Sequence, residues 1–311
     1  MTDTSSSVPN VFKFYSYTKE YLVGGCATAT AGLFTNPLDL VKTRFQLQGE
    51  LKARGAYEVK YRTIFDAFIK IYRHEGITGL QKGLVSAIAY QLAMNSTRLG
   101  TYQTIMNTGI TKNSNGEQQF WKLALAGAFS GCCGSLVANP FYLAKVQMQS
   151  AASPDIAVGY QHKHSGLLQA LKTAYYSTGG LTQGLTSSMA RVSVGSATQL
   201  ATFTRAKQFF TAAALTESEI GIVFMASVCS SIALTCTMTP FDVVATRMFN
   251  QKHGLYYNGL WDCISKMYKH EGLLGFYKGT SAHFFRIGPH SFLTLTIWDS
   301  CILKMSCVTE N

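Results

Sequence analysis

Charged side chains are scarce in this sequence. They make up 14% of the 311 residues, and hydrophobic residues make up 47%, whereas about a quarter of a soluble domain is usually charged. Long apolar runs are scarce as well, because few windows of about 20 residues lack a polar group. This combination favours a membrane bundle whose helices contact lipid on one side and a polar cavity on the other.

Several functional classes lack the residues that they would need. The eight cysteines form no C-x-x-C pair and show no zinc-ligand spacing, and no nucleophile–base pair or metal cluster is evident. We therefore expect no enzymatic activity, no cofactor and no bound metal. The net charge of +11 at pH 7 suits anionic partners. Without an arginine-rich run or an RNA-binding motif, we expect no nucleic acid among them.

Proline is scarce too, and half of the six prolines recur in one setting. Pro37, Pro140 and Pro240 lie about one hundred residues apart, and each interrupts a helical pattern. The three segments read Asn36-Pro-Leu-Asp-Leu-Val-Lys-Thr-Arg-Phe-Gln46, Asn139-Pro-Phe-Tyr-Leu-Ala-Lys-Val-Gln-Met-Gln149 and Thr239-Pro-Phe-Asp-Val-Val-Ala-Thr-Arg-Met-Phe249. This is a threefold internal repeat. A soluble α-solenoid is the alternative, but its repeats usually span about 20–50 residues, half the length found here.

Each repeat is predicted to hold two long helices with a short amphipathic helix between them. The first long helix should span 16–47 and kink at Pro37, because proline removes one helical hydrogen bond. The short helices are expected at 62–74, 165–177 and 258–270, and the second long helices at 84–107, 185–212 and 280–304. About 20 helical residues span a membrane, so we predict six spanning helices. The repeats are expected at 16–110, 116–213 and 217–306, after a disordered tail at 1–15.

The charge of the loops predicts the orientation. Residues 48–82 carry seven Lys and Arg residues, whereas residues 107–118 carry only Lys112. Positive loops stay on the non-translocated side, so the linkers within the repeats should lie there and both termini on the other side. Three repeats in one orientation imply a pseudo-threefold axis along the membrane normal, with a substrate site between the repeats near the midplane.

The pattern P-x-[DE]-x-x-[KR]-x-[KR], followed about thirty residues later by [DE]-G-x4-aromatic-[KR]-G, resembles the mitochondrial carrier family over residues 16–306. The second element is clearest at Glu271-Gly-Leu-Leu-Gly-Phe-Tyr-Lys-Gly279. The resemblance implies an all-α monomer of the mitochondrial inner membrane, with six tilted helices, three short matrix helices and both termini towards the intermembrane space. It also implies alternating access, controlled by a charge network at each end of a central cavity.

In the matrix network that the resemblance implies, the acid of one repeat pairs with the base of the next. Asp39 is then expected to meet Lys145, and Asp242 to meet Lys42. The alternative is that these four residues are ordinary charges on helix surfaces.

The third pair of that network is expected to lack charge. It would join Tyr142 to Ala245, so the acid and the base are missing together. Losing both is less costly than leaving one buried charge alone, which supports the expected ring. The family's bracing glutamine is matched by Gln46 and Gln149 and is replaced by Phe249.

The pattern [FY]-[DE]-x-x-[KR], which forms the cytoplasmic network in the family, is incomplete here. Its segments read Tyr102-Gln103 with Met106, Phe203-Thr204 with Lys207, and Trp298-Asp299 with Ile302. A polar link is expected only between Gln103 and Lys207. We therefore expect a weaker closure on the intermembrane side.

Four glycines open predicted helices, and they are candidate lipid sites: Gly83, Gly166, Gly259 and Gly279. Exposed N–H groups and the positive end of a helix suit a lipid phosphate, and the resemblance implies cardiolipin. Simple helix-start turns explain these glycines equally well.

Two arginines and a tyrosine lie at one level of the predicted bundle. Tyr90, Arg191 and Arg286 each follow a helix-opening glycine by seven residues, which places them two helical turns, about 10 Å, inside the membrane. A cation there costs about 2.5–3.5 kcal/mol, so it indicates function. With no acid expected nearby, the arginines leave unbalanced positive charge facing the cavity. Guanidinium groups match carboxylate or sulfate oxygens, although pairing with backbone carbonyls is the structural alternative.

These three positions match the substrate contact points of the family. Gln91 and Asn95 are expected to add neutral hydrogen bonds, and Arg98 a third positive charge, unless it faces lipid or supports a gate. The segments 90–102 and 286–290 resemble the branch that contains the oxaloacetate carrier. The resemblance implies transport of oxaloacetate, malonate or other oxo- and dicarboxylates, with sulfate or thiosulfate as further candidates. Uncoupling-type proton or fatty-acid-anion transport and a transport-dead scaffold are the alternatives, and uniport, exchange and proton symport all stay open.

Overall fold

The computed structural model describes residues 30–53, 55–111, 119–213, 219–252 and 254–287, and these residues form helices and no strands. The helices are 30–47, α2 (Ile64–Leu80), α3 (Leu84–Asn107), α4 (Phe120–Ser150), α5 (Leu167–Tyr176), α6 (Leu185–Ala212), α7 (Glu219–Asn250), α8 (Leu260–Glu271) and 280–287. Three 3-10 segments lie in the connections: η1 (Pro154–Ile156), η2 (Gly180–Thr182) and η3 (Leu273–Tyr277). The predicted all-α class is confirmed. The tail 1–15, residues 16–29 of the first helix and residues 288–304 of the last lie outside the described residues.

The short helices fall where the sequence predicts them, with one difference. Helix α2 continues beyond its predicted end at residue 74, but Gly76 has φ 68 and ψ −167 and divides it into two helical parts. Such a backbone conformation favours glycine because it carries no Cβ. The second part of α2 is therefore the turn that leads to α3.

The first proline segment is tied to this turn. Pro37 has no N–H, so the carbonyl of Leu33 lacks its usual helical partner and accepts a hydrogen bond from Gln81 Nε2 at 3.2 Å. Asn36 Nδ2 donates to the carbonyl of Lys82 at 3.4 Å. The proline thus frees a carbonyl that helps to fix the start of α3 against the first long helix.

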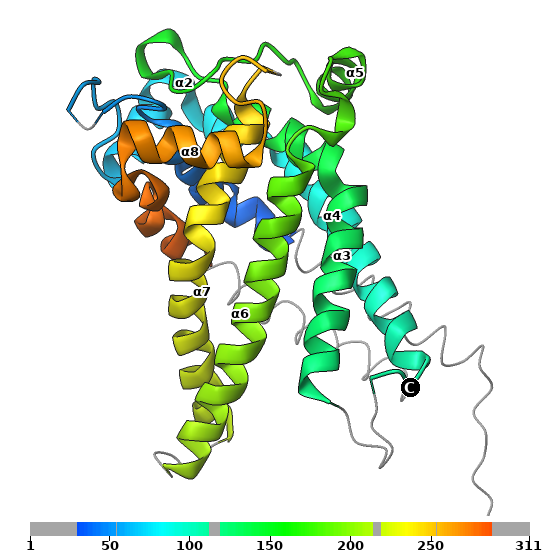
Figure 1. Ribbon diagram of the computed structural model, residues 1–311. Coiled ribbons are helices and arrows are strands. Elements are labelled where there is room, and N and C mark those ends of the chain that lie inside the picture. Colours follow the sequence, from blue (N-terminus) through cyan, green and yellow to red (C-terminus); the bar gives the residue numbers. More distant parts are fainter. Residues whose placement is uncertain (1–29, 54, 112–118, 214–218, 253, 288–311) are drawn as a thin grey trace, which may run out of the picture.

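The long helices form two adjacent pairs, α3 with α4 and α6 with α7 (Figure 1). The pairs separate away from the end that carries α2, α5 and α8, which we name the short-helix end. Within the described residues, the stretches Trp121–Ser150 and Gly221–Asn250 are long and apolar enough to cross a membrane. Helices α3 and α6 reach 24 and 28 residues and are more polar, as expected for helices that face a cavity.

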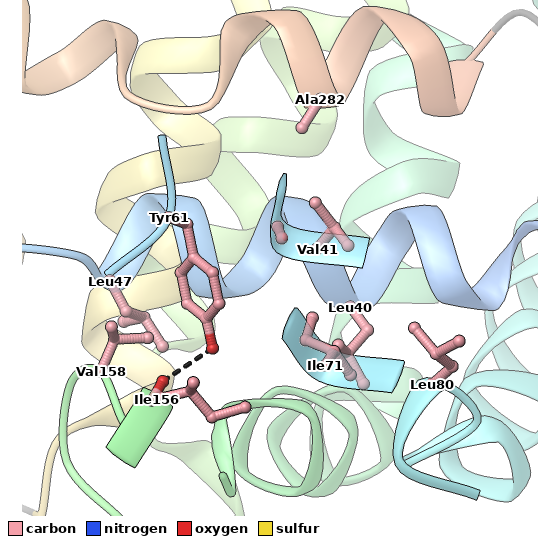
Figure 2. Close-up of a cluster of buried hydrophobic side chains, with 10 residues drawn as sticks. Leu40, Val41, Leu47, Tyr61, Ile71, Leu80, Ile156, Val158 and Ala282 are labelled. Atoms are coloured by element: carbon pink, nitrogen blue, oxygen red, sulfur yellow. Dashed lines mark hydrogen bonds between the residues drawn. The ribbon is translucent and has the colours of Figure 1, made fainter. Parts of the chain in front are cut away.

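Tight packing is concentrated at the short-helix end. Leu40 and Leu47 of the first helix are buried there with Ile71 of α2 (Figure 2). The hydroxyl of Tyr61 donates to the carbonyl of Ile156 at 2.7 Å, which joins the first repeat to the second. This end of the bundle is therefore closed, and it holds the three proline segments.

Candidate functional site

Two buried ion pairs join the proline segments. Lys42 Nζ lies 2.5 Å from Asp242 Oδ2, and Lys145 forms an ion pair with Asp39. All four residues are less than 10% exposed, so removing one partner would leave an uncompensated buried charge. The structure thus contains both expected pairs, and they connect the first repeat to the second and to the third.

The two predicted bracing glutamines have different partners. Gln46 Nε2 donates to Asp242 Oδ2 at 2.6 Å, and its Oε1 accepts from Thr246 Oγ1 at 2.7 Å. Gln149 Oε1 instead accepts from Thr43 Oγ1 at 3.0 Å. Gln46 therefore braces an ion pair directly, whereas Gln149 binds the side chains of Thr43 and Asn36 in the first repeat.

The third position of the ring is apolar. Tyr142 and Ala245 are buried in one cluster with Phe249, and the rings of Tyr142 and Phe249 lie 4.8 Å apart in an edge-on contact. Phe249 thus fills the place of the missing bracing glutamine. At this ring position the contact between the second and third repeats is hydrophobic, whereas the other two ring positions hold ion pairs.

The expectation that the arginines have no acid nearby was wrong. Arg191 Nη1 lies 3.8 Å from Asp242 Oδ1, and Arg286 Nε lies 3.4 Å from Asp39 Oδ1. Because the long helices converge at the short-helix end, residues two turns inside one helix reach the acids of its neighbours. Each carboxylate therefore faces one lysine and one arginine, which come from the two other repeats. Four cations surround two acids, so an excess of positive charge remains.

A narrow cavity lies beside one of these clusters. It has a volume of about 20 Å³, and its polar lining includes Asp39, Lys145, Arg286 and Gln91. A cavity of that size holds about one water molecule, so a solute has to displace side chains to enter it. Lys145, expected only in the gate, thus also belongs to the lining.

The other predicted contact residues are more dispersed. Tyr90 Oη accepts a hydrogen bond from Arg191 Nη2 at 3.0 Å, so these two residues, predicted to lie at one level of the bundle, contact each other directly. Asn95 is half-buried on α3. Arg98 packs through its Cβ close to Gly134 of α4, which makes it part of the contact between α3 and α4.

The expected link at the opposite end is not formed. Gln103 Nε2 donates to Asn107 Oδ1 of its own helix at 3.0 Å rather than meeting Lys207. The reason is the separation of α3 from α6 at that end (Figure 1). Asp299 lies outside the described residues.

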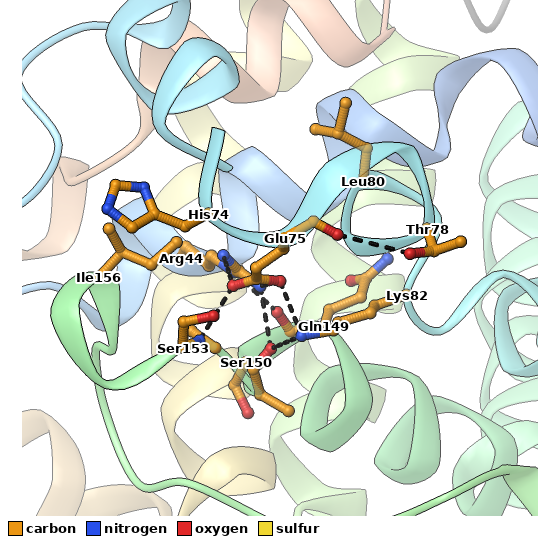
Figure 3. A network of polar contacts seen from close by, with 12 residues as sticks. Arg44, His74, Glu75, Thr78, Leu80, Lys82, Gln149, Ser150, Ser153 and Ile156 are labelled. Atoms are coloured by element: carbon orange, nitrogen blue, oxygen red, sulfur yellow. Dashed lines mark hydrogen bonds and ion pairs between the residues drawn. The ribbon is translucent and has the colours of Figure 1, made fainter. Parts of the chain in front are cut away.

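A second charged cluster, which the sequence reasoning missed, joins repeats at the short-helix end. We name this cluster of an Arg, a Glu and a Lys the latch. Both guanidinium arms of Arg44 reach Glu75 at 2.9 Å, and Lys82 Nζ reaches the same carboxylate at 2.7 Å (Figure 3). Lys82 also donates to the carbonyl of Ala151 in the second repeat. Burial would raise the pKa of Glu75, but its bonds to Arg44 and Lys82 hold that pKa below the usual value.

The same latch recurs in the third repeat. Arg247 and Lys278 both bind Glu271, and Lys278 donates to the carbonyl of Gln48 in the first repeat at 3.0 Å. Burial would raise the pKa of Glu271, but its bonds to Arg247 and Lys278 hold that pKa below the usual value. The available sequence signal was the Arg two residues after the gate base position in the first and third repeats, together with a Glu and a Lys seven residues apart before the helix-opening glycine.

The second repeat carries a neutral version of this latch. Gln147, Tyr176 and Gln183 stand at the corresponding positions. Gln183 Nε2 donates to the carbonyls of Met248 and Gln251, at 3.0 and 2.8 Å. The contact between the second and third repeats therefore lacks both the charged gate pair and the charged latch.

Two of the helix-opening glycines, Gly83 and Gly279, pack closely against the proline segments, whereas a Cβ at Gly166 or Gly259 would meet nothing within 4 Å. Gly83 has φ 75, and a Cβ there would lie 3.2 Å from the carbonyl of Lys145. Gly279 has φ 78 and opens its helix in the same way. Gly166 and Gly259 precede α5 and α8, and no side chain caps either helix start.

A helical membrane bundle of three repeats, closed at one end by buried ion pairs, defines a solute transporter. The sequence model of the family described as "Mitochondrial carrier protein" matches residues 13–113, 116–213 and 216–306. The chain belongs to the mitochondrial carrier family, whose members are transporters of the inner membrane rather than enzymes.

Similar proteins are alike over nearly their whole length. Solute carrier family 25 member 35 of Homo sapiens is 41% identical over 293 residues, covering 90% of this chain and 96% of that protein. The mitochondrial oxaloacetate transport protein of Schizosaccharomyces pombe is 39% identical, covering 89% and 87%. The mitochondrial citrate transporter E of Aspergillus niger is 37% identical, covering 90% and 91%.

Proposed function

We propose that this carrier moves small dianions across the mitochondrial inner membrane by alternating access. The candidates are oxaloacetate, malonate, malate and related oxo- or dicarboxylates, with sulfate or thiosulfate as inorganic counterparts. The observation that carries the proposal is the excess of positive charge at the closed end, where Arg191 and Arg286 join two lysines around two acids. Relatives named for oxaloacetate and citrate transport support an anionic solute.

In this proposal the solute competes with the gate acids for the arginines. A carboxylate of the solute binds Arg286 in place of Asp39, and a second one binds Arg191 in place of Asp242. Each gate acid then loses one of its two cations, and the negative solute also attracts Lys145 from its pair. The closed end is weakened, and the gate opens as the opposite end closes around the solute.

We assign the short-helix end to the matrix and the termini to the intermembrane side, in accord with the positive charge of the loops. We further propose that the carrier works as a monomer and binds cardiolipin. The uncapped starts of α5 and α8 suit a lipid phosphate. Exposed aromatic residues such as Phe65 and Trp261 on the short helices suit the headgroup region. Stabilisation by cardiolipin but not by phosphatidylcholine, in a detergent-solubilised monomer, is the expected result, and equal stabilisation would count against it.

Uptake into liposomes tests the function. Labelled malonate, malate, oxaloacetate and sulfate are supplied outside, with and without the same anion inside, which separates exchange from uniport. We expect saturable uptake that Arg191→Ala and Arg286→Ala each abolish. The control Lys269→Ala removes an exposed positive charge from α8 and should leave uptake unchanged.

Two outcomes would overturn the proposal. Undiminished uptake by both arginine variants would remove the proposed site. Folded protein that takes up none of these anions would favour either a scaffold or, if it conducts protons in the presence of fatty acids, uncoupling-type transport.

A further inference from the structure

Tyr142 occupies the place of a gate carboxylate without forming a gate pair. The first and third repeats carry Asp39 and Asp242 at this position, and Tyr142 faces Ala245 instead of a base. Its side chain is 5% exposed. The ring packs 4.9 Å from Tyr90 and 4.8 Å from Phe249, measured between centroids. It is thus the centre of an aromatic cluster at the level of the proposed solute site.

Two cations from different helices lie against this ring. The guanidinium carbon of Arg191, on α6, is 4.7 Å from the centroid, and Lys145 Nζ, on α4, is 5.6 Å from it. The negative face of an aromatic ring attracts cations. The ring of Tyr142 therefore stabilises two positive charges close together without neutralising either.

Within the part of the chain that the structure describes, Arg191 uses little of its hydrogen-bonding capacity. The guanidinium carries five N–H donors. One is used by Tyr90 Oη at 3.0 Å, Asp242 lies farther away at 3.8 Å, and among the described residues the buried Nε meets no acceptor. The attraction between this cation and the ring needs no hydrogen-bond acceptor, so it does not use up the N–H donors. A carboxylate at residue 142 would instead bind those donors.

We propose that Tyr142 is a positioning and specificity-determining residue for the transported anion, because its ring attracts Arg191 without accepting its hydrogen bonds and so leaves N–H donors for the solute. This inference rests on the proposed function. In this view, Tyr142 stands where the other repeats carry an acid because the ring favours solute binding, although the gate has one ion pair fewer. An acid in its place would keep Arg191 in an internal ion pair.

The test compares four substitutions by their effect on malonate uptake in liposomes. Tyr142→Phe keeps the ring, and we expect its KM to stay within about twofold of the wild type. Tyr142→Leu should raise KM about fivefold, which corresponds to about 1 kcal/mol of cation–ring attraction, with a smaller change in maximal rate. Tyr142→Asp should raise KM about tenfold or more by capturing Arg191. Phe249→Leu is the matched control, because it disrupts the same cluster without touching Arg191, and it should lower thermal stability at unchanged KM.

If the Tyr142→Leu variant transports malonate with the KM of the wild type, the inference is overturned while the proposed function stands. A KM raised equally by Phe249→Leu would also overturn it, since general loosening of the cluster would explain both results. If Tyr142→Leu does not fold, Tyr142→Met fills the space with a flexible side chain and takes its place. Wild-type protein that transports no anion removes the proposed function and this inference together.

Discussion

Asp242 is the residue whose change should disturb the closed end most. It is fully buried, pairs with Lys42 at 2.5 Å, accepts from Gln46 at 2.6 Å and faces Arg191 at 3.8 Å. Asp242→Asn keeps the shape and removes the charge. Breaking a buried ion pair by removing one partner costs about 3–5 kcal/mol. At about 2 °C per kcal/mol for a chain of this size, the midpoint of thermal unfolding should fall by roughly 6–10 °C.

A compensating double variant tests whether the stranded charge causes this loss of stability. Asp242→Asn combined with Lys42→Gln leaves no stranded lysine and imitates the uncharged pair that Tyr142 and Ala245 already form. We expect the double variant to regain more than half of the lost stability, with the remainder reflecting Arg191, which keeps no acid nearby. Glu58→Gln changes an exposed carboxylate and should have little effect. A double variant as unstable as the single one would refute the idea that stranded charge is the cause.

Two further predictions concern the latch and the glycine turn. Glu75 and Glu271 have pKa values below their usual 4.5, so their contribution to the folding stability is present above about pH 4.5 and is lost as the pH falls through the lower folded pKa. Thermal midpoints measured between pH 7 and 3 should therefore decline at the acid end, and the double variant Glu75→Gln with Glu271→Gln should flatten that decline. An unchanged slope would exclude the latch as its source. Gly83→Ala should lower the free energy of unfolding by about 1–2 kcal/mol, because φ is 75 and the new Cβ meets the carbonyl of Lys145; chemical denaturation measures this, with Gly127→Ala, where a Cβ meets nothing within 4 Å, as the control.

The repeat made much of the closed end predictable. Asp39 and Lys145 could be paired from sequence because the same motif occurs three times, and three equivalent helices meet around one axis. The joint loss of charge at Tyr142 and Ala245 was visible for the same reason. The bounds of α3 and α6 followed from the glycines before them.

The rest depends on how far the helices converge. Whether Arg191 reaches Asp242 is decided by the approach of α6 to α7, which no spacing within either helix encodes. Lys82, beside the candidate lipid site Gly83, binds the buried carboxylate of Glu75, a contact that the turn sequence alone does not encode. The link between Gln103 and Lys207 was expected from a motif that says nothing about which end is closed.

Equilibrium binding of labelled malonate to the purified carrier tests the central claim most directly. The wild-type protein and Lys269→Ala should bind it saturably, and Arg191→Ala and Arg286→Ala should each lose that binding while they stay folded. Equal affinity in all four proteins would contradict the assignment of the solute to the two arginines.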